Sequence, residues 1–455
     1  MTENKLGTMP VKKLVISMSL PIMISMVIQA LYNIVDSIFV AQVSEKALAA
    51  VSFAFPIQMI IVSVSVGTGV GINSFMSRCL GEKNLKQANA VAMNGVFLGI
   101  LSWLLFVVFG IAGSRWFMTL FTEDAELIEM GTQYISICCV FSIGVFIQLV
   151  MERIMQATGN PMYHMILQGL GAVTNIILDP ILIFGWFGLP ALGVAGAAIA
   201  TVIGQIVAML VGIWFTQKKV TEIHLGWKGF RPNGNMIRKI YAVGVPAMFI
   251  QGMMAIMMLF MNTILAGFSD LAVSVFGIYY KLQNFMFMAI LGMTNALIPI
   301  VGYNYGAKNG WRMRESIRFS VFLGCVIMLC GTVIFQLFPR QLLLMFNASE
   351  EMMDIGIPAL RIISLSFVFA AVSMLLCAAF QAVGNGVKSL LITLGRQLVI
   401  VVPLAWVFAS WKGLDATWYS FLIAEAVCMV WSLFMMKQMS DRFIKPYLTL
   451  EQKED

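Results

Sequence analysis

Long apolar runs, separated by short polar segments, fill the chain from residue 14 to residue 437. Most runs exceed about 18 residues, which is enough for a helix to cross a hydrocarbon core roughly 30 Å thick. The strands of a membrane barrel would instead be short and alternating. The pattern predicts an all-α membrane protein with twelve spans, at 14–43, 48–77, 90–112, 130–155, 163–187, 192–216, 240–266, 272–302, 316–338, 355–383, 387–410 and 416–437.

Composition supports the same interpretation. Hydrophobic residues make up 60% of the 455 residues and charged residues 11%, whereas a soluble domain is roughly 25% charged. The first run is longer than the core of a signal peptide, and no cleavage site of small residues follows it. The sequence contains no P-loop, metal-ligand cluster or nucleophile motif. We therefore expect neither an enzyme nor an ATP-driven pump, and no cofactor.

Basic residues gather on one side of the predicted membrane. Twenty-two of the 29 Lys and Arg residues lie in the termini, or in and beside the loops that follow even-numbered spans. The other side holds Lys46, Arg115, Arg340 and Lys412. Because cytoplasmic loops are enriched in Lys and Arg, we predict a multi-pass protein of the cytoplasmic membrane with both termini inside. The net charge of +7 then reflects topology and not a nucleic-acid-binding surface.

The two halves of the chain repeat at a fixed offset. "GEKN" at 81–84 recurs as "GAKN" at 306–309, and "QATGN" at 156–160 recurs as "QAVGN" at 381–385, always 225 residues apart. Each repeat holds an even number of spans, so both have the same orientation about an axis along the membrane normal. Parallel repeats of this kind are typical of secondary transporters. We predict an N-terminal six-helix lobe at 1–217, a linker at 218–239 and a C-terminal six-helix lobe at 240–455.

Acidic and polar residues inside the first six spans occur at one depth. Asp36, Asp179 and Thr201 all lie roughly 10–14 Å below the predicted outer surface. Asn33 and Asn175 precede the two acids by three and four residues, on the same helical faces. An Asp at the bilayer centre costs about 2.5–3.5 kcal/mol, and no cation in these spans offsets it. Oxygen ligands suit hard cations, and two close carboxylates suit a proton carrier. We predict a site for H+ or Na+; the alternative is a structural hydrogen-bond network between helices.

The remaining charges inside spans are harder to interpret. Lys281, in "YYKLQNF" at 279–285, either pairs with an acid or lines a cavity. Arg361 and Arg396 lie near span ends, where we expect their side chains to reach the interface by snorkelling. Glu152 lies at a cytoplasmic span end, and Glu425 has no evident partner.

Several stretches together resemble one transporter family. They are "LPIMISMVIQALYNIVDSIFVA" (20–41), "GEKN", "QATGNP", "NIILDPILIFG" (175–185), "GVAGAAIAT" (193–201) and "YNYGAKN" (303–309). On these residues the chain resembles the multidrug and toxic compound extrusion (MATE) family, in its DinF-like branch. The resemblance implies a V-shaped fold of two six-helix bundles and cation-coupled export of drugs or toxic organic compounds.

The resemblance also assigns roles to residues. It implies that the coupling H+ or Na+ binds at Asp36, Asn175, Asp179 and Thr201. The NorM-like branch carries acids in spans 7 and 10, which this chain lacks, so no cation site is predicted in the second half.

Substrates and partners follow from the same interpretation. We expect amphipathic, often cationic small molecules as substrates, the lipid bilayer as surroundings and a monomeric transporter. A lipid-linked sugar flippase of related fold is the alternative, and it would need a wide cationic cavity. The residues expected to line the substrate cavity are Gln29, Tyr32, Tyr279, Lys281 and Gln283.

Overall fold

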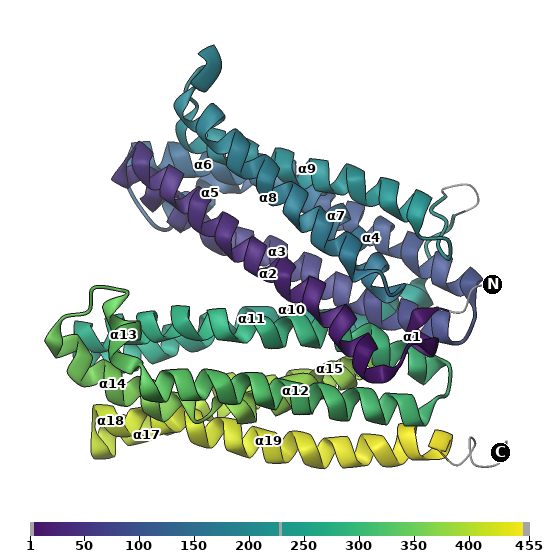
Figure 1. Cartoon of the computed structure of the whole chain (residues 1–455). Helices are drawn as coiled ribbons and strands as arrows, with labels where there is room; N and C mark the ends of the chain where they lie inside the picture. Colours follow the sequence, from purple (N-terminus) through teal and green to yellow (C-terminus); the bar gives the residue numbers. More distant parts are fainter. Residues whose placement is uncertain (1–3, 227–229, 449–455) are drawn as a thin grey trace. The chain divides into compact units, whose positions relative to one another are not determined.

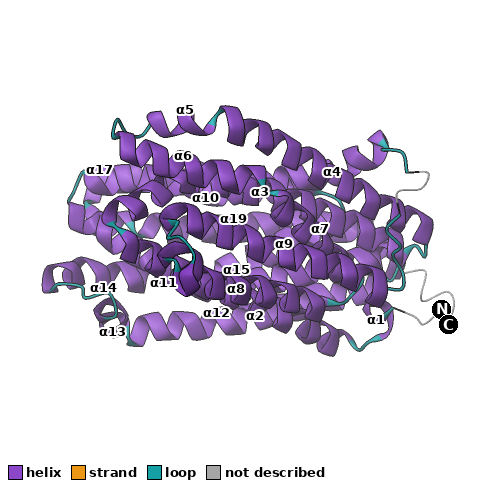
Figure 2. Ribbon diagram, turned by 90° about the horizontal axis from the view of Figure 1, so that it is seen from above, coloured by secondary structure: helices purple, strands orange, loops and turns teal. Residues whose placement is uncertain are grey.

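The computed structural model describes residues 4–226 and 230–448. Figure 2 shows helices joined by short loops throughout these ranges. Lys228 and Lys453, two of the predicted cytoplasmic basic residues, lie outside the described residues. The first half contains α1 (Lys5–Thr8), α2 (Val11–Val43), α3 (Glu45–Gly81), α4 (Leu85–Ala112), α5 (Ser114–Thr119), α6 (Ala125–Val140), α7 (Ile143–Ala157), α8 (Pro161–Phe184), the 3-10 turn η1 (Trp186–Gly188) and α9 (Gly193–Lys219).

The second half follows the same order. It contains α10 (Gly234–Ala266), α11 (Asp270–Gly306), α12 (Gly310–Leu337), α13 (Pro339–Leu344), α14 (Glu350–Ser364), α15 (Phe367–Ala382), α16 (Gly386–Leu394), the π-helical turn η2 (Gly395–Val399), α17 (Val401–Lys412), α18 (Leu414–Thr417), α19 (Tyr419–Met439) and the π-helical turn η3 (Ser440–Ile444).

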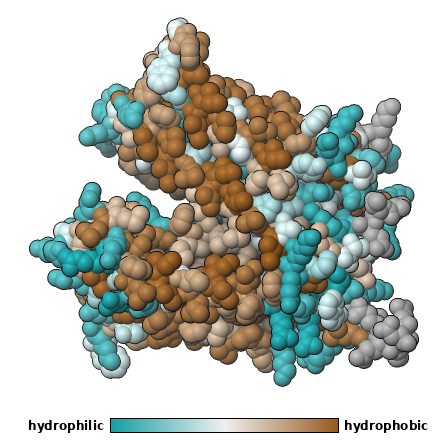
Figure 3. All heavy atoms as spheres, viewed as in Figure 1, coloured by the Kyte–Doolittle hydropathy of each residue, from teal (hydrophilic) through white to brown (hydrophobic). Residues whose placement is uncertain are grey.

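The predicted membrane architecture is confirmed. Among the described residues, 10 helices are long and apolar enough to span a membrane, and up to 12 spans result when each of two bent helix pairs counts as one. The bent pairs are α6–α7, with an angle of 44°, and α14–α15, with an angle of 46°. Figure 3 shows hydrophobic side chains along the middle of the helices and hydrophilic ones gathered at their ends, as expected where only the ends meet water.

Local structure repeats with the sequence. Helices α3 and α11 each have 37 residues. Each begins after a serine whose hydroxyl accepts a hydrogen bond from the backbone N–H of the residue three positions later. These caps are Ser44, which accepts from the Ala47 N–H at 3.0 Å, and Ser269, which accepts from the Ala272 N–H at 3.1 Å. Such a cap satisfies one of the free N–H groups at a helix start. Both helices are followed by a lysine at positive φ, 57° at Lys83 and 58° at Lys308. The repeat therefore specifies helix ends as well as spans.

The spans predicted at 130–155 and 355–383 are broken rather than continuous. No proline lies at either break. A serine hydroxyl instead donates to the carbonyl three residues earlier: Ser142 to the Cys139 oxygen at 2.8 Å, and Ser366 to the Ile363 oxygen at 2.7 Å. Side-chain bonds of this kind compete with the helical backbone ladder. This competition explains two bends that apolar run length alone could not predict.

Contacts divide the chain into two compact units. We call Ile24–Met248 the N-terminal unit, and the residues up to Met23 together with those from Phe249 onward the C-terminal unit. The start of the chain packs in the latter, where Arg312 Nη2 on α12 donates to the Leu6 oxygen at 3.2 Å and the Met9 oxygen at 2.7 Å. The boundaries between the two units lie within α2 and within α10. The lobes predicted from the sequence instead meet at the linker, residues 218–239.

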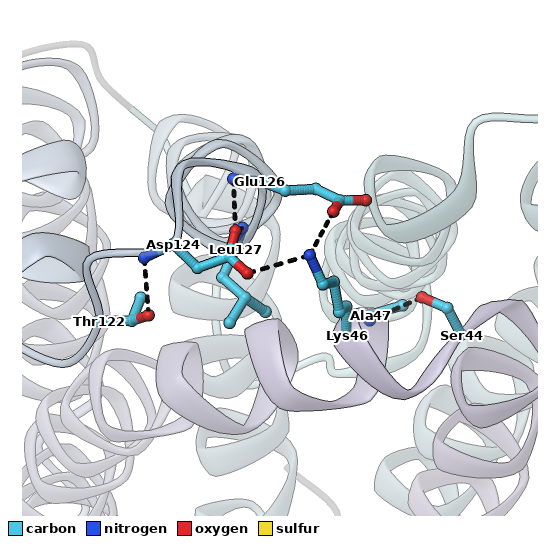
Figure 4. Close-up of polar contacts among 7 residues, drawn as sticks. All are labelled: Ser44, Lys46, Ala47, Thr122, Asp124, Glu126 and Leu127. Atoms are coloured by element: carbon cyan, nitrogen blue, oxygen red, sulfur yellow. Dashed lines mark hydrogen bonds and ion pairs between the residues drawn. The ribbon is translucent and has the colours of Figure 1, made fainter.

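The side predicted to face outward carries bases that are matched by acids. Lys46 Nζ lies 3.0 Å from Asp124 Oδ2 and 2.6 Å from Glu126 Oε2 (Figure 4). Arg340 Nη2 lies 2.7 Å from Glu350 Oε1. Part of the positive charge on this side is therefore neutralised locally, as that of Lys445 is by Asp441 on the opposite side.

Candidate cation-coupling site

Close packing of α8 against α9 builds one wall of the candidate site (Figure 1). The two helices approach through glycines: a Cβ on Gly204 would lie 2.7 Å from the Gly171 oxygen. Small residues allow helix backbones in a membrane to approach this closely. The approach brings Asn175, one turn after Gly171, alongside Thr201, one turn before Gly204.

Asn175, Asp179 and Thr201 form a contiguous polar group. The Asn175 amide nitrogen lies 3.3 Å from Asp179 Oδ1 and 3.2 Å from Thr201 Oγ1. With the amide oxygen and nitrogen exchanged, the nitrogen donates to Asp179 Oδ2 at 3.2 Å and the oxygen accepts from the Thr201 hydroxyl at 3.2 Å. The second arrangement gives each atom a complementary partner. Asn175 and Asp179 are both buried, and Thr201 is half-buried.

Asp36 of α2 completes the cluster. Its carboxyl group neighbours that of Asp179 and interacts with it. Three residues further along α2, the Phe39 ring packs edge-on against Phe184 of α8 with centroids 6.3 Å apart, which aligns the two helices near the acids. Asp36 Oδ1 is buried and has no hydrogen-bond partner. The structure therefore brings together four of the five predicted cation-site residues.

The donor set fits either predicted ion. A hydrogen bond between two carboxyl groups requires a proton on one of them, so the pair can hold one proton. The unpartnered Asp36 oxygen, with oxygens of Asp179, Asn175 and Thr201, also supplies the hard ligands that Na+ takes, as oxygen-binding cations generally do. Among the described residues, no Lys or Arg pairs with either acid. The charge of a bound cation would therefore be balanced by the site itself.

A small polar cavity adjoins the cluster on the side facing the α7–α8 loop. Its volume is about 30 Å³, and a water needs roughly 10–15 Å³ of such space. It is therefore large enough for one or two waters but not for a drug. Its lining residues are Tyr32, Gln148, Gln168, Gly171, Ala172, Asn175, Thr201, Gly204 and Gln205.

Other predicted residues lie elsewhere. The side chains of Asn33 and Gln29 are exposed on α2, so Asn33 does not join Asp36. One residue before Asn33, Tyr32 faces the cavity instead. In the C-terminal unit, Lys281 is exposed and lies over the Phe346 ring at 6.0 Å.

The two other cavity predictions in the C-terminal unit concern Tyr279 and Gln283. Tyr279 is 1% exposed and packs beside Phe276 in the core, while Gln283 is half-buried. The lining of a substrate cavity by these residues stays a prediction.

The expectation for Arg396 was wrong. Its side chain does not reach the interface: it is 11% exposed, and its Nε lies 3.6 Å from Glu425 Oε1 on α19. The cause is close packing of η2 on α19, where a Cβ on Gly395 would lie 3.1 Å from the Trp431 ring. Glu425, for which the sequence offered no partner, is therefore paired. Arg361 is exposed on α14.

Sequence reasoning also missed a second buried polar cluster in the N-terminal unit. Glu152 of α7 is 0% exposed, and its Oε2 lies 3.1 Å from His164 Nδ1 on α8. The other ring nitrogen, Nε2, lies 2.9 Å from the Ser25 hydroxyl on α2. One signal was available: Gln148 stands one turn before Glu152 and interrupts an otherwise apolar run from Val145 to Met151.

Comparisons with known proteins agree with this architecture. Multidrug export protein MepA from Staphylococcus aureus (strain MSSA476) is 26% identical over 435 residues, covering 95% of both chains. MepA from Staphylococcus haemolyticus (strain JCSC1435) is 25% identical over 432 residues, covering 94% of both. These relatives are transport proteins, in keeping with the expectation that the chain is not an enzyme.

Solved structures show the same fold. A multidrug resistance MATE family transporter of the MOP superfamily in an outward-facing conformation superposes with a TM-score of 0.91 at 27% identity, covering 98% of this chain and 99% of that one. A MOP superfamily transporter from Pyrococcus furiosus superposes with a TM-score of 0.87 at 27% identity, covering 97% and 98%. The model of the MatE family matches residues 21–181 and 246–407, one segment in each repeat. The chain therefore belongs to the MatE family of membrane transporters.

Proposed function

We propose that this transporter exports drugs or other toxic organic compounds in exchange for a coupling cation, H+ or Na+. The curated relatives named above are multidrug export proteins. The observation that carries the coupling proposal is the acid pair, buried Asp179 and half-buried Asp36, which no basic residue of the described chain neutralises. Buried acids without a partner are costly in a membrane and mark ion pathways.

The exchange follows from competition between two states of the N-terminal unit. With no cation bound, the acid pair carries negative charge that its surroundings do not offset. Binding of one cation reduces that charge and allows α2 and α8 to pack more closely at the site. If the drug binds better to one arrangement and the cation to the other, each displaces the other, because a ligand shifts an equilibrium only by its differential affinity. Movement of one charge inward gains about 2.3 kcal/mol per 100 mV.

Finer features of the proposal rest on sequence. Amphipathic cationic substrates fit a chain with 35 Met and 33 Phe residues, because Met adapts to varied shapes. The lack of acids in spans 7 and 10 supports the DinF-like branch. We further propose a monomer of the cytoplasmic membrane with both termini inside.

The orientation can be tested by labelling. Asn84 and Asn309 lie in the loops after α3 and α11, which the distribution of basic residues places in the cytoplasm. In a variant whose native cysteines are replaced, Asn84→Cys and Asn309→Cys should resist a membrane-impermeant maleimide in intact cells. Glu351→Cys, at the other end of the spans, is the positive control. Labelling at the first two positions without permeabilisation would reverse the orientation.

The function itself can be tested in proteoliposomes. We would measure efflux of tetraphenylphosphonium, a lipophilic cation, under a sodium gradient and a pH gradient imposed separately. One gradient should drive efflux by the wild-type protein and neither should drive it in Asp36→Asn. Equal efflux with and without gradients would contradict coupling. Failure to export any compound of a broad panel would favour the flippase alternative.

A further inference from the structure

The Glu152–His164 cluster is chemically a proton-binding group. Glu152 accepts hydrogen bonds from Gln148 Nε2 at 2.9 Å and from Gln168 Nε2 at 3.3 Å, in addition to its contact with His164. His164 is 6% exposed. When the neutral ring carries its hydrogen on Nε2, Nε2–H donates to the Ser25 hydroxyl and the bare Nδ1 faces Glu152 Oε2. When the ring is protonated, Nδ1 also carries a hydrogen, which points toward Glu152. The cluster can thus gain or lose a proton without losing its contacts.

One cavity lies between this cluster and the coupling site. The 30 Å³ cavity is lined on one side by Gln148 and Gln168, the two amides that bond to Glu152, and on the other by Asn175 and Thr201, the partners of Asp179. Neither Glu152 nor Asp179 lines the cavity itself, and each is joined to it by amides that hydrogen-bond to its carboxyl group. All of these residues belong to the N-terminal unit.

The cluster also lies at the opposite end of the helices from the acid pair. His164 is near the start of α8, and Asp179 follows it by 15 residues, roughly 22 Å along the helix axis. Ser25 precedes Asp36 on α2 by 11 residues, roughly 16 Å. Ionisable groups near the cluster are Tyr32 on α2 and Arg153 on α7, whose Nη1 donates to Gln156 at 2.9 Å. The cluster thus occupies the route from the acid pair to the α7–α8 loop.

We infer that Glu152 and His164 form a second proton-binding station, through which the coupling proton passes between the Asp36–Asp179 pair and the cytoplasm. This inference rests on the proposed function and names its ion as H+. The proton leaves an Asp carboxyl oxygen and reaches a water in the cavity when the Asn175 amide, which lies between Asp179 and the cavity, releases Asp179. That water gives a proton to Glu152 Oε2 when Gln168 releases it, leaving an Asp carboxylate and a Glu152 carboxylic acid. Glu152 then passes the proton to His164 Nδ1, and Nε2–H carries it toward Ser25.

Proton release on drug binding tests the inference. Purified protein in weakly buffered detergent would receive tetraphenylphosphonium while an indicator dye records the protons released. In Glu152→Gln, which keeps the size and a hydrogen-bonding amide, release should fall by about one proton per bound drug. His164→Gln should slow proton-driven efflux at least tenfold at unchanged drug affinity. Glu425→Gln in the C-terminal unit is the matched control: it makes the same acid-to-amide change outside the cluster, so proton release should stay at the wild-type value.

The outcomes separate this inference from the proposed function. If Asp36→Asn abolishes coupled efflux while Glu152→Gln and His164→Gln both behave as wild type, the station is refuted and the coupling site stands. If the wild-type protein responds to sodium alone and releases no protons, the inference fails and the sodium form of the proposal holds. If Glu425→Gln reproduces the loss in Glu152→Gln, the loss is not specific to the cluster and the station is refuted. Melting temperatures of all variants show whether a loss reflects misfolding.

Discussion

Each unit buries acid among its membrane-spanning helices, but the two treat that charge differently. In the N-terminal unit, Asp36 and Asp179 lie beside each other, and Asp36 Oδ1 has no partner. In the C-terminal unit, Glu425 lies 3.6 Å from Arg396, with side chains 15% and 11% exposed. The N-terminal unit therefore contains acids without a paired base, and the C-terminal unit contains an ion pair.

The difference shows which half can respond to a cation. A buried ion pair is already neutral, so a further cation has little to gain by binding to it. Two acids without a base are stable only when a proton or metal ion joins them or when they meet water. Although the halves repeat in sequence, helix length and capping, they therefore differ in this function. The proposed coupling therefore belongs to the N-terminal unit, and the Arg396–Glu425 pair connects η2 to α19.

The largest effect is expected from neutralising the acid pair. Asp36→Asn keeps the size of the side chain but removes the charge that a cation would balance. Gradient-driven efflux of tetraphenylphosphonium should fall to the rate seen without a gradient, while drug binding persists, because a ligand with equal affinity for both states shifts nothing. The matched variant in the other unit, Glu425→Gln, should retain coupling. Coupled efflux by Asp36→Asn at near-normal rate would remove the distinction between the units.

The second effect concerns the balanced pair. Arg396→Met leaves Glu425 buried without a partner, which should lower the free energy of unfolding by about 3–5 kcal/mol. The double variant Arg396→Met with Glu425→Gln should regain most of this loss, because neither charge is then stranded. Thermal unfolding in detergent measures both, and transport by the double variant should remain gradient-dependent. A double variant that is as unstable as the single one would show that the pair does more than balance charge.

These two regions also show how far sequence alone reaches. Apolar run length and the fixed offset predict twelve spans in two repeats, and depth along the helices is enough to group Asp36, Asn175, Asp179 and Thr201. Both results rest on regular spacing, which can be read directly from the order of residues. The prediction from spacing was wrong for Asn33. A side chain three residues before Asp36 points about 60° away from it around the helix axis, and in this helix that rotation leaves Asn33 exposed.

Partners from distant helices were beyond such reasoning. His164 meets Glu152, and Arg396 meets Glu425, only because helices pack at particular rotations and heights. The π-helical turn at η2 is one example, since it alters the direction of Arg396 without any local signal beyond a glycine. Residues that are polar and isolated in apolar runs can be recognised from sequence, but their partners depend on tertiary packing.

A smaller effect is expected where the coupling site depends on close helices. Gly204→Ala places a Cβ 2.7 Å from the Gly171 oxygen and 3.5 Å from Asn175 Cβ, so α8 and α9 must separate. We expect a loss of about 1–3 kcal/mol in stability and weaker coupling, since Thr201 moves away from Asn175. Gly169→Ala on α8 is the control, because nothing lies within 4 Å of its added Cβ. Equal behaviour of the two variants would show that this contact does not support the site.

The smallest effect is expected for Asp124, an acid paired with Lys46 at the surface. It adds a solvent-exposed acid to the comparison of acids among the spans. Hydrogen bonding from Lys46 lowers the pKa of Asp124 below its ordinary value of 3.8. A carboxyl group whose pKa is lowered on folding stabilises the folded state above its unfolded pKa, and this contribution is lost as pH falls through the folded pKa. Lys46→Met should therefore lower the melting temperature slightly at neutral pH.

The difference between Lys46→Met and wild type should disappear below the lowered pKa of Asp124, in a series from about pH 7 to about pH 2. It should also shrink at about 1 M salt, because water and ions screen exposed pairs. Arg115→Met is the control, since its contact with Glu129 is longer, at 3.8 Å. A difference that persists at low pH would mean that Lys46 stabilises this end through packing of its aliphatic chain and not through the charge of Asp124.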